Sequence, residues 1–308
     1  MNIRSRKRGG RQLNQRQLLF LMGLPFIVLT ILFYYIPLYG WIYAFVDYKP
    51  GIPLSHSAFV GLKYFKLAFS EASNLRQVMI NTLALSFLSL LTAPLAVLFA
   101  VFLTEMRSAK YRKLIQTTTT LPNFISWVLV YSVFFVFFNL NDGFVNQLLM
   151  KLDLIKEPFN MLGSARYAWL FQTFVSVWKS LGWGAIIYMA AIAGIDPEQY
   201  DAAKVDGAGR YRMMRHVTIP GVMPTFVVIL ILSIGNVLSN GFEQFYVFYN
   251  PLVADKLEVL DYYVYRIGLT LNDYSFATAI GIFKSVISII LVFSVNILSK
   301  KIRGNSVF

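Results

Sequence analysis

The stretch QYDAAKVDGAGRYRMMRHVTIPG, residues 199–221, is much more polar than the sequence on either side of it. In the whole chain of 308 residues only 14% are charged and 57% are hydrophobic, whereas about a quarter of the residues in a soluble domain are charged. The composition indicates a membrane protein in which this stretch lies between two apolar segments. Eight charges gather within this stretch and just before it, at Asp196, Glu198, Asp201, Lys204, Asp206, Arg210, Arg212 and Arg215.

Long apolar runs flank this stretch and recur along the chain. Two segments contain one charge each, Lys179 in 167–195 and Lys284 in 274–299, and four contain none. All six exceed the roughly 20 residues that cross a bilayer, so they predict an all-α membrane protein with six transmembrane helices. The first run is too long for a signal peptide and no small-x-small cleavage site follows it. The four uncharged runs are 17–46, 77–104, 114–141 and 217–242.

Positive charge alternates between the segments that connect these runs. The basic N-terminal segment 1–16, loop 105–113, the polar stretch and the C-terminal tail 300–308 together hold seventeen Lys and Arg residues. The other three loops together hold nine, with ten acidic residues. Because cytoplasmic loops carry the excess of positive charge, we predict a multi-pass protein of the bacterial cytoplasmic (inner) membrane with both termini cytoplasmic. The chain then forms one transmembrane domain, 17–299. Its cytoplasmic segments account for the net charge of +13, so this charge does not indicate binding to nucleic acid.

The segment 196–220, named here the polar hairpin, contains the signals of a short helix-turn-helix. Asp196 can cap a helix whose first position is a proline, and a glycine at 207 or 209 can end it in the left-handed conformation. A second, basic helix follows, and Pro220 disfavours helix at the residue before it. The two alanines at 202 and 203 leave little bulk, which suits insertion into a partner's groove. A solvated hairpin on the membrane surface fits the same pattern.

Asp201-Ala202-Ala203, then three residues, Gly207, nine residues and Val217-Thr218-Ile219-Pro220, have the spacing of a known motif. They resemble the Glu-Ala-Ala, or "EAA", loop of ABC importer permeases, with Asp for Glu, Val for Ile and Ile for Leu. Five longer stretches resemble the carbohydrate-importer branch, which is related to the maltose-type permeases. The last two look most like permeases for polysaccharide fragments and complex oligosaccharides. The stretches are FVGLKYFKLAF (59–69), LPNFISWVLV (121–130), GIDPEQYDAAKVDGAG (194–209), GFEQFYVFYNPLV (241–253) and LDYYVYRIGL (260–269).

The resemblance implies a type I ABC importer permease fold and a subunit that forms half of a translocation pathway. The implied partners are a second homologous permease chain, a cytoplasmic ABC ATPase dimer and an extracytoplasmic solute-binding (lipo)protein, with a carbohydrate substrate and surrounding membrane lipid. The sequence contains no G-x-x-x-x-G-K-[ST] motif, so we expect ATP and Mg to be bound by the ATPase, and no cofactor and no enzyme site in this chain. The implied ATPase-coupling residues are Tyr200, Asp201, Ala202, Ala203, Asp206, Gly207, Ala208, Gly209 and Pro220.

Polar side chains in and near the spans are candidates for the sugar path. A lysine inside a span is costly and usually faces a cavity or a partner, and cationic Lys179 would suit an acidic sugar such as a uronate or a sialylated glycan. Lys284, nearer a helix end, fits snorkelling equally well. The amides and the glutamate near the end of 217–242 fit either a sugar path or hydrogen bonds between helices. The candidates are Trp178, Lys179, Asn236, Asn240, Glu243, Gln244 and Lys284.

Two other classes of membrane protein were weighed against the importer. An ion-coupled secondary sugar transporter usually carries carboxylates well inside its spans, and this sequence places none there. A membrane enzyme needs a catalytic constellation, but His56 and His216 fall on opposite sides of the predicted membrane and cysteine is absent. We therefore predict no catalytic site and no metal site.

Overall fold

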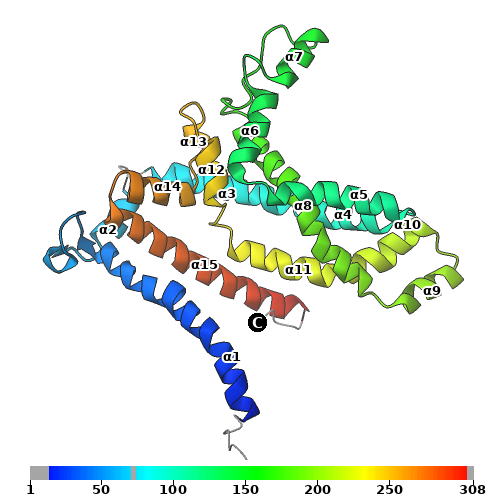
Figure 1. Cartoon of the computed structure of the whole chain (residues 1–308), viewed down its shortest axis with the longest axis horizontal. Helices are drawn as coiled ribbons and strands as arrows, with labels where there is room; N and C mark the ends of the chain where they lie inside the picture. The colour runs from blue at the N-terminus through cyan, green and yellow to red at the C-terminus, as the bar shows by residue number, and fades with distance from the viewer. Residues whose placement is uncertain (1–13, 71–73, 304–308) are drawn as a thin grey trace, which may run out of the picture.

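The computed structural model describes residues 14–70 and 74–303, and these are mostly helical (Figure 1). One two-stranded antiparallel sheet pairs Val46 with Phe59. The elements are α1 (Gln15–Thr30), η1 (Ile31–Tyr35), η2 (Ile36–Phe45), β1 (Val46–Asp47), η3 (Leu54–His56), β2 (Ala58–Phe59), α2 (Lys63–Ala68), α3 (Leu75–Thr92), α4 (Pro94–Thr104), α5 (Ala109–Thr120), η4 (Leu121–Phe124), α6 (Trp127–Phe138), α7 (Phe144–Lys151), α8 (Ala168–Ala193), α9 (Pro197–Val205), α10 (Arg210–Met213), η5 (Met214–Thr218), α11 (Ile219–Gly235), α12 (Phe242–Phe248), α13 (Ala254–Leu257), α14 (Leu260–Tyr265), η6 (Arg266–Thr270) and α15 (Tyr274–Arg303).

Five continuous helical spans in the described part of the chain are long and apolar enough to cross a membrane. They correspond to five of the six predicted helices, so the prediction of a helical membrane protein is confirmed. The basic segment 1–16 lies largely outside the described residues, as does part of the tail 300–308. The five spans are Leu18–Phe45, Leu75–Thr104, Ala168–Ala193, Arg210–Gly235 and Tyr274–Ile297.

The prediction of one helix over 114–141 was wrong, because this span is broken. Its two halves, Ala109–Phe124 and Trp127–Phe138, meet at 108°. The described chain has a sixth span only if these two bent halves are taken together as one. Pro122 lies just before the break and lacks a backbone donor. After the break, Ser126 restarts the helix by accepting a hydrogen bond from the Leu129 amide at 3.4 Å. Apolar composition predicted a membrane span here, but composition does not indicate the direction in which each half of the span runs.

The predicted boundaries of the fifth span, 217–242, were also wrong at both ends. The helix begins at Arg210 and continues through Pro220 to Gly235. A π-helical turn, η5, lies just before the proline, and such a turn shifts the hydrogen-bond register so that a missing donor is tolerated. The helix then ends before Gly241, which has a positive φ of 83° and leads into α12.

Helix α8 is the centre of the packed bundle. It contacts α4, α5 and α11, and Gly182 permits the closest approach. A Cβ atom placed at Gly182 would lie 2.3 Å from the Thr119 backbone of α5. The small residues of the segment 182–194 therefore allow a close helix contact. In contrast, α1 diverges from the other helices in Figure 1, and none of its most apolar window is buried.

The end of the molecule opposite the polar hairpin, named here the far end, is closed by short elements. Helices α2 and α14 lie there in Figure 1, while α9 and α10 lie at the other end. The Ser275 hydroxyl at the start of α15 donates to the Val46 carbonyl at 2.7 Å. The Tyr64 hydroxyl donates to Asp47 Oδ1 at 2.7 Å, and burial together with Asp47 raises the pKa of Tyr64 to about 12. The phenol therefore stays a donor at neutral pH.

Candidate functional site

The first half of the polar hairpin is a capped helix, α9. Asp196 Oδ1 accepts a hydrogen bond from the Glu198 amide at 3.0 Å, and Pro197 occupies the first turn, as predicted. At the other end Gly207 has a φ of 70°. Its amide donates to the Lys204 carbonyl at 3.0 Å, while the Ala208 amide donates to Ala203 at 2.8 Å. These two bonds form a Schellman C-cap, so Gly207 is the glycine that ends α9.

Most of α9 faces outward from the chain. Asp201 pairs with Lys204 at 2.9 Å on the exposed surface, and the side chain of Val205 is 89% exposed. Tyr211, just past the turn, is 69% exposed. Apolar side chains this exposed on a charged surface are typical of a protein contact site. The sequence analysis did not single out these two residues, although each interrupts a charged run.

Three contacts fix the polar hairpin in place: one within it, one to the turn between α4 and α5, and one between the two residues that flank it. The Tyr200 hydroxyl lies 3.1 Å from Thr218 Oγ1, and the Arg210 guanidinium pairs with the carboxylate of Glu105. The third is the packing of Ile195 against Gly221, where a Cβ atom would lie 2.5 Å from Ile195 Cδ1. Loop 105–113 and the polar hairpin therefore lie at the same end of the molecule, as their shared positive charge predicted.

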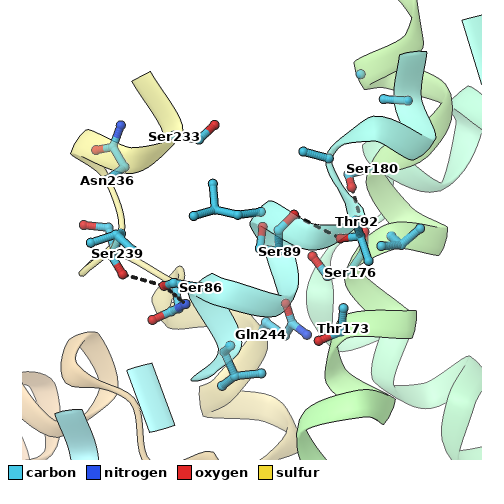
Figure 2. Close-up of a pocket in the computed structure, with 18 of the residues that line it drawn as sticks. Ser86, Ser89, Thr92, Thr173, Ser176, Ser180, Ser233, Asn236, Ser239 and Gln244 are labelled. Carbon is cyan, nitrogen blue, oxygen red and sulfur yellow. Dashed lines mark hydrogen bonds between the residues drawn. The ribbon is translucent and has the colours of Figure 1, made fainter. Parts of the chain in front are cut away.

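A polar cavity of about 520 Å³ lies between α3, α8, α11 and α12 (Figure 2). Hydroxyl and amide side chains supply half of its lining residues, and no charged side chain is among the described residues that line it. Trp183 and Phe245 contribute aromatic surface. The hydroxyls come from three helices and the segment after α11, at Ser86, Ser89, Thr92, Thr173, Ser176, Ser180, Ser233 and Ser239.

Three of the predicted path residues line this cavity, namely Asn236, Asn240 and Gln244. Gln244 is buried and donates to the Gln172 backbone and side-chain oxygens at 3.0 and 2.8 Å. Asn240 Nδ2 donates to Ser86 Oγ at 2.9 Å, and its Oδ1 is a buried acceptor without a partner in the described chain. The cavity therefore presents neutral hydrogen-bonding groups.

Trp178 and Lys179 lie outside the cavity lining. Lys179 is 7% exposed, and its ammonium donates to the carbonyls of Pro122, Asn123 and Ile125 at 3.0, 2.9 and 2.5 Å. These carbonyls belong to the break between α5 and α6, where helical acceptors lose their partners. Lys179 therefore supplies hydrogen bonds to the carbonyls at the break in the span. All three of its N–H donors are used in doing so.

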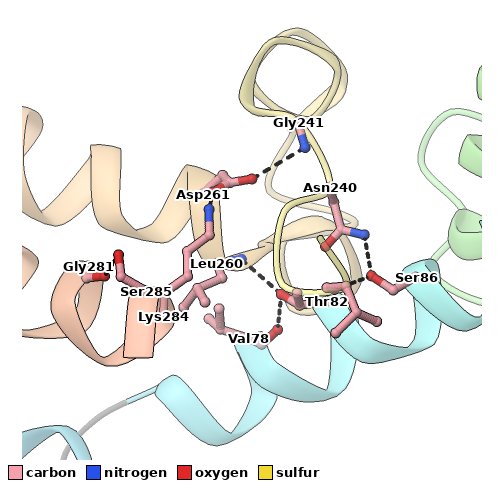
Figure 3. Close-up of polar contacts among 11 residues, drawn as sticks. Val78, Thr82, Ser86, Asn240, Gly241, Leu260, Asp261, Gly281, Lys284 and Ser285 are labelled. Atoms are coloured by element: carbon pink, nitrogen blue, oxygen red, sulfur yellow. Dashed lines mark hydrogen bonds and ion pairs between the residues drawn. The ribbon is translucent and has the colours of Figure 1, made fainter. Parts of the chain in front are cut away.

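Glu243 and Lys284 also lie outside the cavity lining. Glu243 is exposed on α12. Lys284 forms an ion pair with Asp261 of α14, whose other carboxylate oxygen accepts the Gly241 amide at 3.3 Å (Figure 3). Both charged side chains are mostly buried. Lys284 therefore joins α15 to α14 and to the segment before α12, and the snorkelling alternative does not describe its position.

The sequence analysis missed the hydroxyl lining, although its signal was present. Ser86, Ser89 and Thr173, Ser176, Ser180 recur every three or four residues within α3 and α8, so each set lies on one helix face. Such stripes are often satisfied within their own helix, as Ser180 is by the Ser176 carbonyl at 2.8 Å. Only the assembled helices bring both stripes to one cavity.

Residues 93–304 match a known protein family, described as "Binding-protein-dependent transport system inner membrane component". The match begins at the kink between α3 and α4, includes the whole polar hairpin and ends in α15. The chain belongs to this family. It is thus a permease component of a multi-pass inner-membrane transport system that works with a binding protein, and the ion-coupled alternative is not supported.

Related permeases cover nearly the whole chain. Protein LplB of Bacillus subtilis is 41% identical over 94% of this chain and 91% of its own length. The polygalacturonan/rhamnogalacturonan transport system permease protein YteP of the same organism is 38% identical over 98% of this chain and 94% of its own length.

Solved structures give the same result for the fold. A chain of a bacterial alginate ABC transporter, crystallised with an alginate pentasaccharide-bound periplasmic protein, has a TM-score of 0.84 and 33% identity, covering 94% of this chain and 96% of that chain. A second structure, of a transporter involved in the import of the acidic polysaccharide alginate, has a TM-score of 0.84 and 34% identity over 93% and 96%. The permease fold predicted from the sequence is confirmed.

Proposed function

We propose that this permease imports oligosaccharides or polysaccharide fragments, driven by a separate ATPase, and that its natural substrates are acidic. The observation that carries the proposal is the likeness to the alginate transporter chain over nearly the full length of both proteins. The permease for polygalacturonan and rhamnogalacturonan adds a second relative whose named substrates are uronate polymers. A second homologous permease chain completes the pathway, and a binding protein delivers the sugar.

The polar hairpin is proposed as the docking element for the ATPase. Residues 200–209 would insert into a groove of that protein, with Asp201 and Asp206 supplying charge contacts, the alanines at 202, 203 and 208 allowing close approach, and the exposed Val205 adding an apolar contact. Gly207 would hold the turn that presents them. ATP and Mg would be bound by the ATPase dimer, and this end of the chain would face the cytoplasm.

The cavity is proposed as this chain's share of the sugar path. Sugar hydroxyls both donate and accept hydrogen bonds, so a lining of serines, threonines and amides suits them. The side chains of Asn236 and Asn240, one turn apart, would lie along this path. Since the lining carries no charge, carboxylates on the sugar would not be held strongly, which suits a path that must release its cargo.

The test is transport by the assembled importer. The complex would be purified from its host through a tag on this chain and reconstituted in liposomes with its binding protein and ATP. We expect uptake of unsaturated oligogalacturonate or alginate fragments above uptake of matched neutral oligosaccharides. Uptake by this chain alone, without ATPase or binding protein, would refute the proposal, and equal uptake of neutral fragments would refute the acidic preference.

A further inference from the structure

Two side-chain contacts cross the base of the polar hairpin. Arg210, the first residue of α10, pairs with Glu105, which follows the end of α4. Tyr200, in the middle of α9, contacts Thr218 in η5 through their hydroxyls at 3.1 Å. Neither pair belongs to the surface that α9 exposes, so their arrangement suggests a role in how the hairpin is held.

The Arg210–Glu105 pair closes a ring of connected elements. Glu105 lies in the turn between α4 and α5, and both of these helices pack on α8. Helix α8 leads through residues 194–196 into α9, and the turn after α9 returns the chain to Arg210. The close approach at Gly182 fixes α5 against α8. The pair therefore fastens the start of the α10–α11 helix to the group formed by α4, α5 and α8.

The Tyr200–Thr218 contact braces the hairpin from the other side. Thr218 is 2% exposed and lies where the helix enters its apolar part. Its partner on α9 is separated from it by the turn at 206–209, which contains two glycines. Open space surrounds both glycines within the chain, and glycine permits many backbone conformations. Without a brace, this turn is the natural place for the hairpin to bend.

We propose that these two contacts make Tyr200, Thr218, Glu105 and Arg210 positioning residues that stiffen the polar hairpin. This inference rests on the proposed docking of the ATPase to α9. A displacement of α9 then moves α11 and the α4–α5 turn together. When a brace is lost, the hairpin bends at its glycines, and ATP hydrolysis continues while less sugar is moved per ATP.

The experiment measures sugar taken up per ATP hydrolysed by the reconstituted importer. Arg210 and Glu105 are partly exposed, with 49% and 27% of their side chains accessible. Removal of either charge should therefore leave the chain folded. We expect Glu105→Gln and Arg210→Gln each to lower the ratio, by up to about fivefold, the largest equilibrium factor typical of an exposed ion pair. The exchange of both charges, Glu105→Arg with Arg210→Glu, should restore it.

Matched variants separate the brace from general effects. Arg212→Gln removes the same charge from the same helix and should leave the ratio unchanged. Tyr200→Phe and Thr218→Val should each lower the ratio, and the double variant should be no worse than either single one. The amount of co-purified ATPase reports docking, and we expect it to stay constant in the Glu105, Arg210 and Thr218 variants, whose side chains lie outside residues 200–209.

Unchanged ratios in both single-charge variants would overturn the inference. So would a loss that the charge exchange does not restore, because the residues would then act individually. Absence of ATP-driven uptake by the unmodified importer would overturn the proposed function and this inference with it. If the unmodified importer takes up sugar normally and the variants have the same ratio of sugar to ATP, only this inference is overturned and the proposed function stands.

Discussion

A lysine in an apolar helix is tolerated where backbone acceptors surround it, and Lys179 has three of them. The acceptors arise because η4 and the break at residues 125–126 interrupt the normal helical bonds. The Trp127 ring adds a cation–π contact, with the Lys179 Nζ 5.3 Å from the ring centre. The side chain thus stabilises the direction of α6 relative to α5.

Lys179→Met should remove the donor that these buried carbonyls share, and within the described chain only the Pro122 carbonyl keeps another, the Ile125 amide at 3.2 Å. An unsatisfied buried polar group costs about 1–3 kcal/mol, so we expect a clearly lower melting temperature of the purified chain in detergent. Lys179→Arg keeps the charge and the donors, so its melting temperature should fall less. Normal stability of Lys179→Met together with an altered sugar preference would instead indicate that this side chain acts on the substrate.

Gly207 is the residue on which the shape of the hairpin most directly depends. Gly207→Pro imposes a φ near −65° where the structure has 70°, and it removes the amide that donates to the Lys204 carbonyl. We expect the variant to insert normally but to lose most of the ATP hydrolysis that loaded binding protein stimulates. Gly194→Ala is the matched control, because Gly194 has an ordinary φ of −87°. Full stimulation in Gly207→Pro would contradict the docking role.

Residues in the polar hairpin could be predicted from the sequence because their signals are local. A cap, a proline and a glycine act within one turn of helix, and Asp196 and Gly207 behave as predicted. The partners of Lys179 and Lys284 could not be predicted in this way. They come from segments 54 or more and 23 residues away in sequence, so they depend on how the spans pack.

At the scale of helices, five of the six spans could be predicted, but the broken course of the remaining one could not. Hydropathy averages over a window, and a break such as that at residues 125–126 leaves the average unchanged. The local signal of the break was Pro122, which lies just before it. Pro220 misled in the opposite direction, because the π-helical turn η5 absorbs its missing donor.

The contact between α5 and α8 permits a sharp test at the same scale. Gly182→Ala would place a Cβ atom 2.3 Å from the Thr119 backbone, whereas Gly184→Ala would meet only the Ala96 Cβ at 3.5 Å. Overpacking of this kind costs about 1–3 kcal/mol. Gly182→Ala should therefore lower the melting temperature, and Gly184→Ala should not. Equal stability of the two variants would mean that the helices are not in close contact.

For the whole molecule, the orientation in the membrane is the main prediction still to be measured. The chain contains no cysteine, so single cysteines can be labelled without background. Asp206→Cys in the polar hairpin should react with an impermeant thiol reagent only from the cytoplasmic side, and Asp255→Cys at the far end only from outside. Both positions are exposed. The opposite labelling pattern would reverse the proposed topology.

The neutral lining of the cavity has an electrical consequence. A bacterium keeps its interior negative, and moving one negative charge inward against that potential requires about 2.3 kcal/mol per 100 mV. Since none of the described lining residues is charged, this chain supplies no counter-charge to a uronate on its way through. We expect collapse of the voltage across proteoliposomes to speed the import of acidic fragments, the more so for longer ones, and to leave neutral fragments unaffected. The import of an acidic glycan would thus be electrogenic, and the opposing free energy from the membrane potential would grow with the length of the glycan.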